Sequence, residues 1–187
     1  MKDMADDKKE LLIKSAVELL KEQAGSCNVT TRELAARSGV NSALINYYFG
    51  SKDGLLKAAV NRILEEAGET LDSGSPSADP RDFLFEFILK MGRLMLQYEA
   101  YTRIVIPNLI LKDPIELPQR LLPAVRAAAG GHDETACRMI SYQLVTFLQV
   151  LFYRMDDVSG YLGFDLRTAG TIEQVIRSEI NLLIPEA

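Results

Sequence analysis

The chain has 187 residues and a net charge of −5, and 48% of its residues are hydrophobic. This hydrophobic fraction is enough to bury a core, so we expect a folded chain. Its longest strongly apolar stretches, 104–111 and 144–152, fall well short of the roughly 20 residues that span a bilayer. The first ten residues lack the apolar segment of a signal peptide, so we expect a cytoplasmic protein without a membrane partner.

The apolar residues recur every three or four positions and never alternate, which predicts an all-α fold of about nine helices. Thr30 followed by Glu33 is a capping box that starts the second helix, while Asn41 and Ser51 cap the third and fourth helices. Pro107 predicts a kink or interruption, and prolines punctuate residues 114–129. The other predicted helices cover 6–23, 51–71, 81–98, 102–112, 133–155 and 167–184.

The charge of the chain is unevenly distributed. Residues 1–62 hold ten Lys or Arg and eight Asp or Glu, a net charge of +2, which leaves −7 for residues 63–187. This asymmetry favours a nucleic-acid contact in the N-terminal third, although ordinary solvated faces could also produce it.

The segment from Thr30 to Lys52 has the pattern of two short helices joined by a glycine turn. Ala35 provides the small residue at the helix crossing, Gly39 the left-handed turn position and Ile45 the inward aliphatic side chain. Leu34 and Val40 complete the small core. The pattern predicts a helix-turn-helix, which presents its second helix to the DNA major groove.

With Ile45 inward, the helical period turns four side chains outward: Ser42, Ala43, Asn46 and Tyr47. Asn46 can pair with an adenine edge, Ser42 can donate or accept, and Ala43 can contact a thymine methyl group. Thr31, Arg32 and Lys52 stand at helix starts, where they can hold phosphates. The alternative is a helical hairpin with a solvated polar face.

The sequences TTRELAARSGV and LINYYFGSKDGLL carry a resemblance that extends over about residues 8–64. This segment resembles the DNA-binding domain of the TetR family of transcriptional regulators. Asn46 stands where the family commonly has Tyr, which removes the phenol that usually contacts a phosphate and shifts this position toward reading a base. Carried over by position, the resemblance implies DNA contacts from Thr31, Arg32, Asn41, Ser42, Ala43, Asn46, Tyr47, Tyr48 and Lys52.

The domain organisation follows from the helix-turn-helix and from the turn-rich stretch SGSPSADP at residues 73–80. We expect a helix-turn-helix DNA-binding domain in residues 1–50, the fourth helix as a connector in residues 51–71, and an effector-binding and dimerisation domain in residues 72–187. Cys27 and Cys137 are isolated from each other and from any metal-ligand pattern, so we expect no metal site and no cofactor.

The resemblance implies a homodimer held by the last two long helices. The helix predicted at 133–155 has more apolar faces than one small domain covers, which agrees with an interface; a fully buried helix in a monomer is the alternative. The expected interface residues are Leu144, Phe147, Leu148, Leu151, Ile172, Val175, Ile176 and Ile180.

The resemblance also implies a pocket for a small-molecule effector. Polar or polarizable groups inside the apolar stretches are candidates for its lining, and plain core packing is the alternative. Arg103 is the sharper candidate for an anionic ligand. The candidates are Met91, Met95, Tyr98, Tyr101, Arg103, Asn108, Tyr142, Thr146 and Gln149.

These patterns favour a dimeric, sequence-specific transcriptional repressor that binds a palindromic double-stranded operator and is released by a small-molecule ligand. The alternative keeps the DNA binding without a small-molecule effector, as an architectural or protein-regulated factor. An enzyme is not expected, because the single histidine and the absence of GxSxG, HExxH and GxxxxGK[ST] leave no assembled catalytic set.

Overall fold

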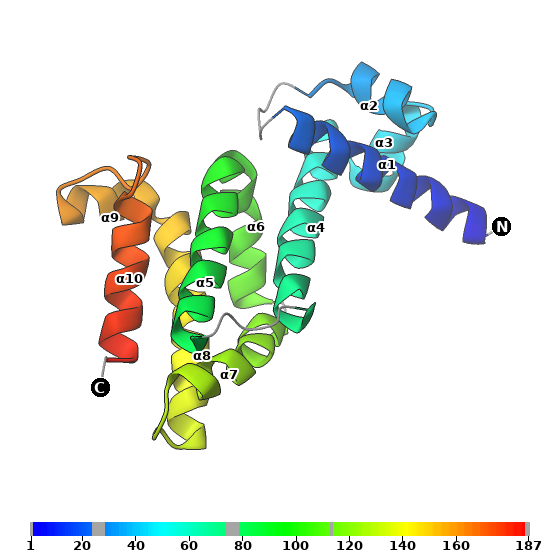
Figure 1. Ribbon diagram of the computed structural model, residues 1–187. Helices are drawn as coiled ribbons and strands as arrows, with labels where there is room; N and C mark the ends of the chain where they lie inside the picture. The colour runs from blue at the N-terminus through cyan, green and yellow to red at the C-terminus, as the bar shows by residue number, and fades with distance from the viewer. Residues whose placement is uncertain (1, 24–28, 74–78, 113, 186–187) are drawn as a thin grey trace. The chain divides into compact units, whose positions relative to one another are not determined.

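The computed structural model describes residues 2–23, 29–73, 79–112 and 114–185, and over these residues it contains α-helices and no strand (Figure 1), which confirms the predicted all-α fold. Cys27 and most of the turn-rich stretch at 73–80 lie outside the described residues. The helices are α1 (Lys2–Glu22), α2 (Thr31–Ser38), α3 (Ala43–Phe49), α4 (Lys52–Ser73), α5 (Pro80–Gln97), α6 (Glu99–Leu111), α7 (Glu116–Ala128), α8 (Glu134–Tyr153), α9 (Met155–Leu162) and α10 (Thr171–Leu183).

Ten helices in the described residues, instead of about nine, result from two local differences. Helix α7 forms in the proline-punctuated stretch: Pro118 lies in its first turn, where a missing N–H leaves no helical bond unmade, and Pro123 lies inside the helix. The helix predicted at 133–155 ends at Tyr153, since Arg154 leaves the helical conformation and α9 begins at Met155. Helix α6 continues through Pro107 to Leu111.

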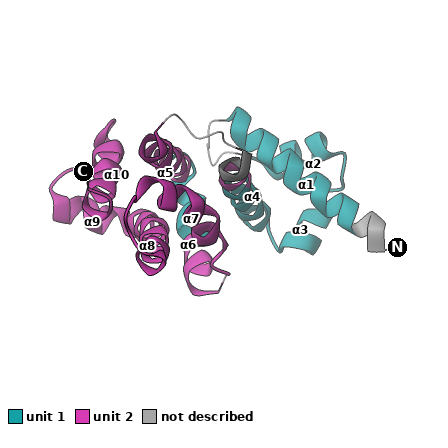
Figure 2. Cartoon of the chain, turned by 60° about the horizontal axis from the view of Figure 1, so that its bottom comes forward, with its two compact units in different colours: residues 1–65, 97–105 teal, residues 66–96, 106–187 magenta. Residues whose placement is uncertain are grey.

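The chain divides into two compact units, coloured separately in Figure 2. Unit 1 comprises residues 1–65 and 97–105, and unit 2 comprises residues 66–96 and 106–187. The boundary therefore falls inside α4 and inside α6, so that the first half of α6 belongs to the same unit as α1, α2 and α3.

The core of unit 1 is built from one apolar face of each of its helices. Tyr98, just before α6, is almost fully buried, and burial raises the pKa of its phenol. Its hydroxyl oxygen accepts a hydrogen bond from Gln97 Nε2 at 3.2 Å. The fully buried aliphatic side chains of this unit are Leu12, Ala16, Leu20, Val29, Leu34, Ile45, Leu55, Leu56, Ala59 and Val60.

In unit 2, helices α5 and α10 pack side by side in opposite directions. Arg81, near the start of α5, donates to Asn181 Oδ1 at 2.5 Å, near the end of α10. At the other end, Arg93 pairs with Glu173 at 3.5 Å, in the first turn of α10. Between them the Arg177 guanidinium lies 4.0 Å from the centre of the Phe85 ring, a cation–π contact.

Gly92, on α5, faces side chains of α10 and α8. A Cβ atom at this position would lie 3.1 Å from Ile176 Cδ1, with Ile172 and Leu148 close behind. A larger side chain at Gly92 would therefore crowd the Ile176, Ile172 and Leu148 side chains.

Helices α7 and α8 form an antiparallel hairpin. Asp133 Oδ1 caps α8 by accepting from the Ala136 N–H at 2.7 Å, and Arg126 pairs with Glu134 at 2.6 Å. The buried Ser141 hydroxyl donates to the Pro118 carbonyl oxygen, which joins the two helices at the far end of the hairpin.

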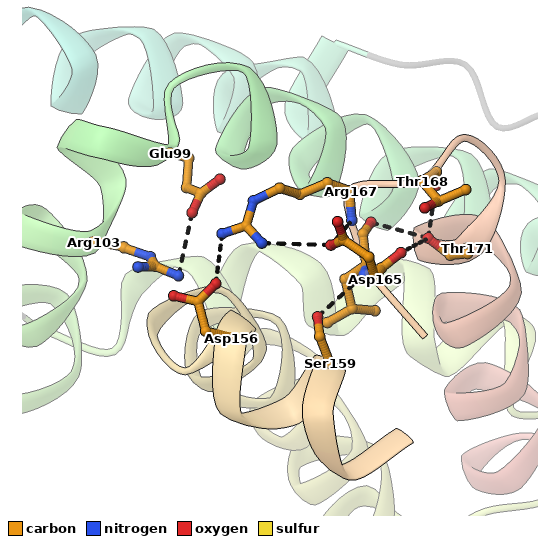
Figure 3. Close-up of polar contacts among 9 residues, drawn as sticks. Glu99, Arg103, Asp156, Ser159, Asp165, Arg167, Thr168 and Thr171 are labelled. Atoms are coloured by element: carbon orange, nitrogen blue, oxygen red, sulfur yellow. Dashed lines mark hydrogen bonds and ion pairs between the residues drawn. The ribbon is translucent and has the colours of Figure 1, made fainter. Parts of the chain in front are cut away.

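A polar network fixes residues 163–170 between α9 and α10 (Figure 3). The Arg167 guanidinium donates to Asp156 Oδ1 at 2.8 Å, and the Thr171 hydroxyl lies within hydrogen-bonding distance of three backbone carbonyls of this segment. Ser159 Oγ accepts from the Leu166 N–H at 3.2 Å. The network orients the start of α10, which begins at Thr171 and not at the predicted Arg167.

Within the described residues, we found no helix that combines the length and the hydropathy needed to cross a bilayer.

Replacing Gly92 by Leu should lower the free energy of unfolding by about 1–3 kcal/mol, because the added side chain overpacks the contact between α5 and α10. Urea denaturation followed by circular dichroism measures this effect. The matched control is Gly160→Leu in α9, where a Cβ meets nothing within 4 Å, and where Leu should stabilise the helix slightly. Equal effects of both substitutions would contradict the close approach at Gly92.

Candidate nucleic-acid interface

Helix α2 begins at a complete capping box. Thr30 Oγ1 accepts from the Glu33 N–H at 3.2 Å, and Glu33 Oε2 accepts from the Thr30 N–H at 2.8 Å. The Thr30 side-chain and backbone hydrogen bonds hold the pKa of Glu33 below its ordinary value of 4.5. The predicted start of the second helix is confirmed.

The turn after α2 depends on a left-handed glycine. Gly39 has φ +65°, a conformation that costs an L residue with a Cβ roughly 1–2 kcal/mol. Ser38 Oγ donates to the Leu34 carbonyl at 2.7 Å and accepts from the Val40 N–H at 3.2 Å. The predicted role of Gly39 is confirmed, and Ser38 closes the turn around it.

The interior of the helix-turn-helix is small and apolar. Leu34 and Ile45 have no exposed surface, and Val40 is buried beside them. Ala35, predicted to lie at the crossing, is half-buried. Because Ile45 is the fully buried residue of the seven-residue helix α3, its position decides which side chains of α3 face outward.

Every side chain predicted to face outward from the second helix is exposed: Ser42, Ala43, Asn46 and Tyr47. Tyr47 has 77% of its surface exposed, an unusually large fraction for an aromatic side chain. Ala43 lies two residues before Ile45 and Tyr47 two residues after it, so both side chains point almost opposite to Ile45 around the helix.

The start of α3 uses the side chain of Asn41. Asn41 Oδ1 accepts from the Ala43 N–H at 2.9 Å. The residue directly before the helix is Ser42, whose hydroxyl makes no capping hydrogen bond. The predicted cap is thus made by Asn41, one position earlier than an ordinary N-cap.

Three consecutive aromatic side chains end α3. The rings of Tyr47 and Tyr48 are 5.0 Å apart and nearly perpendicular, and the Tyr48 and Phe49 rings meet in the same way at 6.3 Å. Such edge-to-face pairs stabilise by roughly 0.5–1.5 kcal/mol. Tyr48 is half-buried and supports the exposed Tyr47 ring.

The candidate phosphate contacts differ in their availability. Thr31 and Arg32 are exposed in the first turn of α2, and Arg32 forms no ion pair with any described residue. Lys52 is half-buried in the first turn of α4, where its Nζ lies 3.8 Å from Asp53 Oδ1. Arg32 is therefore the more accessible of the two cations.

Two other arginines anchor the domain to α1. Arg37, at the end of α2, donates both terminal nitrogens to the Glu22 carboxylate at 2.8 Å and lies 3.5 Å from Glu18. Arg62, on α4, donates to Glu10 at 2.8 Å. Because these bonds join α2 to the end of α1 and α4 to the middle of α1, they help to fix the platform on which α3 is held.

The residues expected to line an effector pocket are distributed over both units. Met91, Met95, Asn108, Tyr142, Thr146 and Gln149 belong to unit 2, and Tyr98, Tyr101 and Arg103 belong to unit 1. The two methionines and the two unit 1 tyrosines are buried, whereas Asn108 and Tyr142 are exposed. Arg103, the candidate for an anionic ligand, lies 3.2 Å from Glu99 Oε1 (Figure 3), so part of its charge is already balanced.

Most of the residues expected at a dimer interface are already buried in unit 2. They are Leu144, Leu148, Leu151, Ile172, Ile176 and Ile180, whereas Phe147 and Val175 are half-buried. The physical reason is that the most apolar face of an amphipathic helix packs into its own domain core.

The opposite face of α8 carries a stripe that the sequence reading missed. Met139, Tyr142, Val150 and Tyr153 are large, apolar and between 41% and 50% exposed. Their spacing of three, eight and three residues keeps them on one side of the helix. On α10, Leu182 is likewise 78% exposed. The helical period of the sequence also places Met139, Tyr142, Val150 and Tyr153 on one side of α8, so the stripe could have been predicted from the sequence.

The left-handed glycine turn, the buried Ile45 and the exposed outer face of α3 define a helix-turn-helix DNA-binding domain. Residues 12–59, which include this motif, match the family model described as bacterial regulatory proteins, tetR family.

Similar proteins extend the comparison beyond this domain. The HTH-type transcriptional dual regulator CecR of Shigella flexneri is 27% identical over 188 residues, covering 84% of this chain and 83% of the relative. The HTH-type transcriptional regulator BetI of Stenotrophomonas maltophilia (strain R551-3) is 37% identical over 82 residues, covering 41% of this chain and 40% of the relative.

A crystal structure of a candidate transcriptional regulator from Streptomyces coelicolor A3(2) shares the fold, with a TM-score of 0.61 at 20% identity, over 94% of this chain and 96% of that one. The family model and the relatives confirm the resemblance to the TetR family of transcriptional regulators, and they support a transcriptional regulator with a helix-turn-helix DNA-binding domain.

The Arg37 hydrogen bonds hold the pKa of Glu22 below its ordinary value of 4.5. A carboxylate whose pKa is lower in the folded than in the unfolded state stabilises the fold above the unfolded value, and this contribution is lost as the pH falls through the folded value. Below about pH 4.5 the wild-type protein should therefore lose stability more steeply than Glu22→Gln.

Urea midpoints measured between about pH 7 and pH 3 compare the two slopes. Asp7→Asn, which removes an exposed carboxylate from the same helix, is the control and should keep the wild-type slope. A Glu22→Gln profile parallel to the wild-type profile through the acid range would contradict the contribution of this ion pair.

Proposed function

We propose that this chain is a cytoplasmic, dimeric, sequence-specific repressor that binds a palindromic operator through α3 and is released by a small-molecule ligand. The observation that carries the DNA-binding part is the exposed outer face of α3, opposite the fully buried Ile45. An exposed face with Ala43, Asn46 and Tyr47 offers methyl, amide and phenol groups, which suit base edges and phosphates in a major groove.

The proposed contacts separate into two kinds. Arg32, Thr31 and Lys52 stand at the starts of α2 and α4 and hold the DNA backbone, which sets the register without reading sequence. The residues on and before α3 approach the bases or the adjoining phosphates. This second group comprises Asn41, Ser42, Ala43, Asn46, Tyr47 and Tyr48.

The central experiment is DNase footprinting by the purified full-length protein on the intergenic DNA beside its own gene. A protected palindrome at modest salt concentration is the expected result. Protection that is absent, or that has no sequence preference, would refute a sequence-specific regulator.

For the dimer we propose an interface on the outward faces of α8 and α10. The support is the exposed apolar stripe of Met139, Tyr142, Val150 and Tyr153, together with Leu182 on α10, because large apolar side chains gathered on one helix face are typical of association surfaces. Phe147 and Val175 flank these faces. A dimer that uses successive major grooves must place its two α3 helices about 34–36 Å apart.

Replacing Val150 by Asp should dissociate the proposed dimer, because association would bury an unpaired carboxylate. Sedimentation equilibrium should show at least a tenfold weaker dimer, equivalent to about 1.4 kcal/mol. Gln119→Asp, an exposed position on α7, is the control and should leave the association unchanged. An unaltered dimer in Val150→Asp would place the interface elsewhere.

The ligand-responsive part of the proposal assigns effector binding and dimerisation to residues 72–187 and DNA binding to residues 1–50, joined by the connector at 51–71. Its support is the resemblance and the polarizable methionines Met91 and Met95 buried in unit 2. A bound effector raises the melting temperature by mass action. Thermal-shift screening of small molecules therefore separates a ligand-controlled repressor from a factor of the same fold without an effector.

Replacing Tyr47 by Ala should weaken operator binding strongly and leave dimerisation intact, because the 77% exposed ring contributes little to the core. A loss of about 1–3 kcal/mol, comparable with one good base or stacking contact, is the expected size. Mobility-shift titration gives the affinity and sedimentation gives the dimer. Parallel loss of affinity and of thermal stability would instead make Tyr47 a structural residue.

A further inference from the structure

Asn41 and Asn46 lie at the outer face of α3, and their side chains have different hydrogen bonds. Asn41 Oδ1 accepts from the Ala43 N–H at 2.9 Å and so closes the first turn of α3. An oxygen held in this bond is fixed in direction, and leaving the Ala43 N–H unpaired costs free energy. The Asn41 oxygen is therefore committed to the start of the helix, which leaves only the Nδ2 group of this side chain for a DNA contact.

The Asn46 side chain does not cap the helix. Its side chain is exposed, and its amide forms no hydrogen bond to any residue that the structure describes. Only its backbone carbonyl is engaged, accepting from the Gly50 N–H at 3.0 Å where the helix ends. The side chain keeps one acceptor, Oδ1, and one two-proton donor, Nδ2, for an external partner.

Asn46 shares the exposed face of α3 with Ala43 and Tyr47. Ala43 lies one turn earlier and is exposed, and the next residue, Tyr47, is supported by the Tyr48 ring at 5.0 Å. Residues three apart are about 4.5 Å apart along a helix, close to the 3.4 Å spacing of base pairs. Ala43 and Asn46 are therefore spaced for neighbouring base pairs.

Among the bases, adenine matches the free groups of Asn46. In the major groove adenine presents the N6 amino group as a donor beside the N7 acceptor, so Oδ1 accepts from N6 while Nδ2 donates to N7. Guanine presents two acceptors at the same edge, which leaves Oδ1 facing another oxygen. The other exposed polar groups of this face, the Ser42 hydroxyl and the Tyr47 phenol, donate and accept at one atom and discriminate less between these bases.

We propose that Asn46 is the main base-reading residue and selects an adenine in each operator half-site, with Ala43 against a thymine methyl group of a neighbouring pair. This inference rests on the proposed sequence-specific DNA binding by α3. It predicts which base is selected and which of the two asparagines selects it.

The experiment begins with selection of bound duplexes from a random double-stranded library by the full-length protein and by the Asn46→Ala and Asn41→Ala variants. The selected wild-type duplex is then made with 7-deazaadenine in place of each adenine in turn, which removes the N7 acceptor and keeps the Watson–Crick pairing. Mobility-shift titrations give the dissociation constants, and thermal melting verifies that each variant is folded.

At one adenine per half-site, the wild-type protein should bind the 7-deazaadenine duplex about 3- to 12-fold more weakly, because one of the two hydrogen bonds is lost from a bidentate contact that is worth about 1–3 kcal/mol in full. Asn46→Ala should show no penalty at that position and should select duplexes without a preference there. Asn41→Ala, the matched control, should keep both the adenine preference and the penalty, even where its overall affinity is lower.

Two results would overturn the inference. If the wild-type protein selects a consensus whose 7-deazaadenine penalties are the same in Asn46→Ala, the protein reads DNA without Asn46, and only this inference fails. If the wild-type protein selects no consensus, the proposed function fails together with it.

Discussion

The structure of the DNA-binding unit depends on the burial of Leu34, Val40 and Ile45 on the two sides of a turn in which Gly39 adopts the left-handed conformation. Three aliphatic side chains are few for a core, so the turn geometry has to be set by the backbone and by the Ser38 hydroxyl bonds. Once Ile45 is fixed inward, the 3.6-residue period leaves Ala43 and Tyr47 outward, and the chemistry presented to DNA follows from that single constraint.

Charged residues of the N-terminal unit divide between holding the domain together and remaining available. Arg37 and Arg62 are engaged by glutamates of α1, which join α2 and α4 to that helix. Arg32 forms no ion pair within the described residues and stays exposed at the start of α2. The number of basic residues in a sequence therefore overestimates the number of side chains that can bind DNA phosphates. Arginines that are paired with glutamates already donate hydrogen bonds within the protein.

Helix α8 has two apolar faces with different uses. Leu144, Leu148 and Leu151 lie in the core of unit 2, and the exposed stripe formed by Met139, Tyr142, Val150 and Tyr153 lies on the opposite side. A helix that is apolar on both sides satisfies one side within its own chain and leaves the other for a partner. One apolar face of α8 thus forms the observed core, and the other forms the proposed dimer interface.

The sequence by itself determined the all-helical class, the capping box at Thr30, the left-handed turn at Gly39 and the exposed set on α3, because each depends on local propensity or helical period. It did not reveal α7, the break at Arg154 or the inward direction of Leu144 and Ile176, since these depend on neighbours distant in the chain. Only the tertiary structure decided that Asn41 holds the helix start while the Asn46 amide stays available, because two asparagines of equal composition differ only in the hydrogen bonds that the fold gives them.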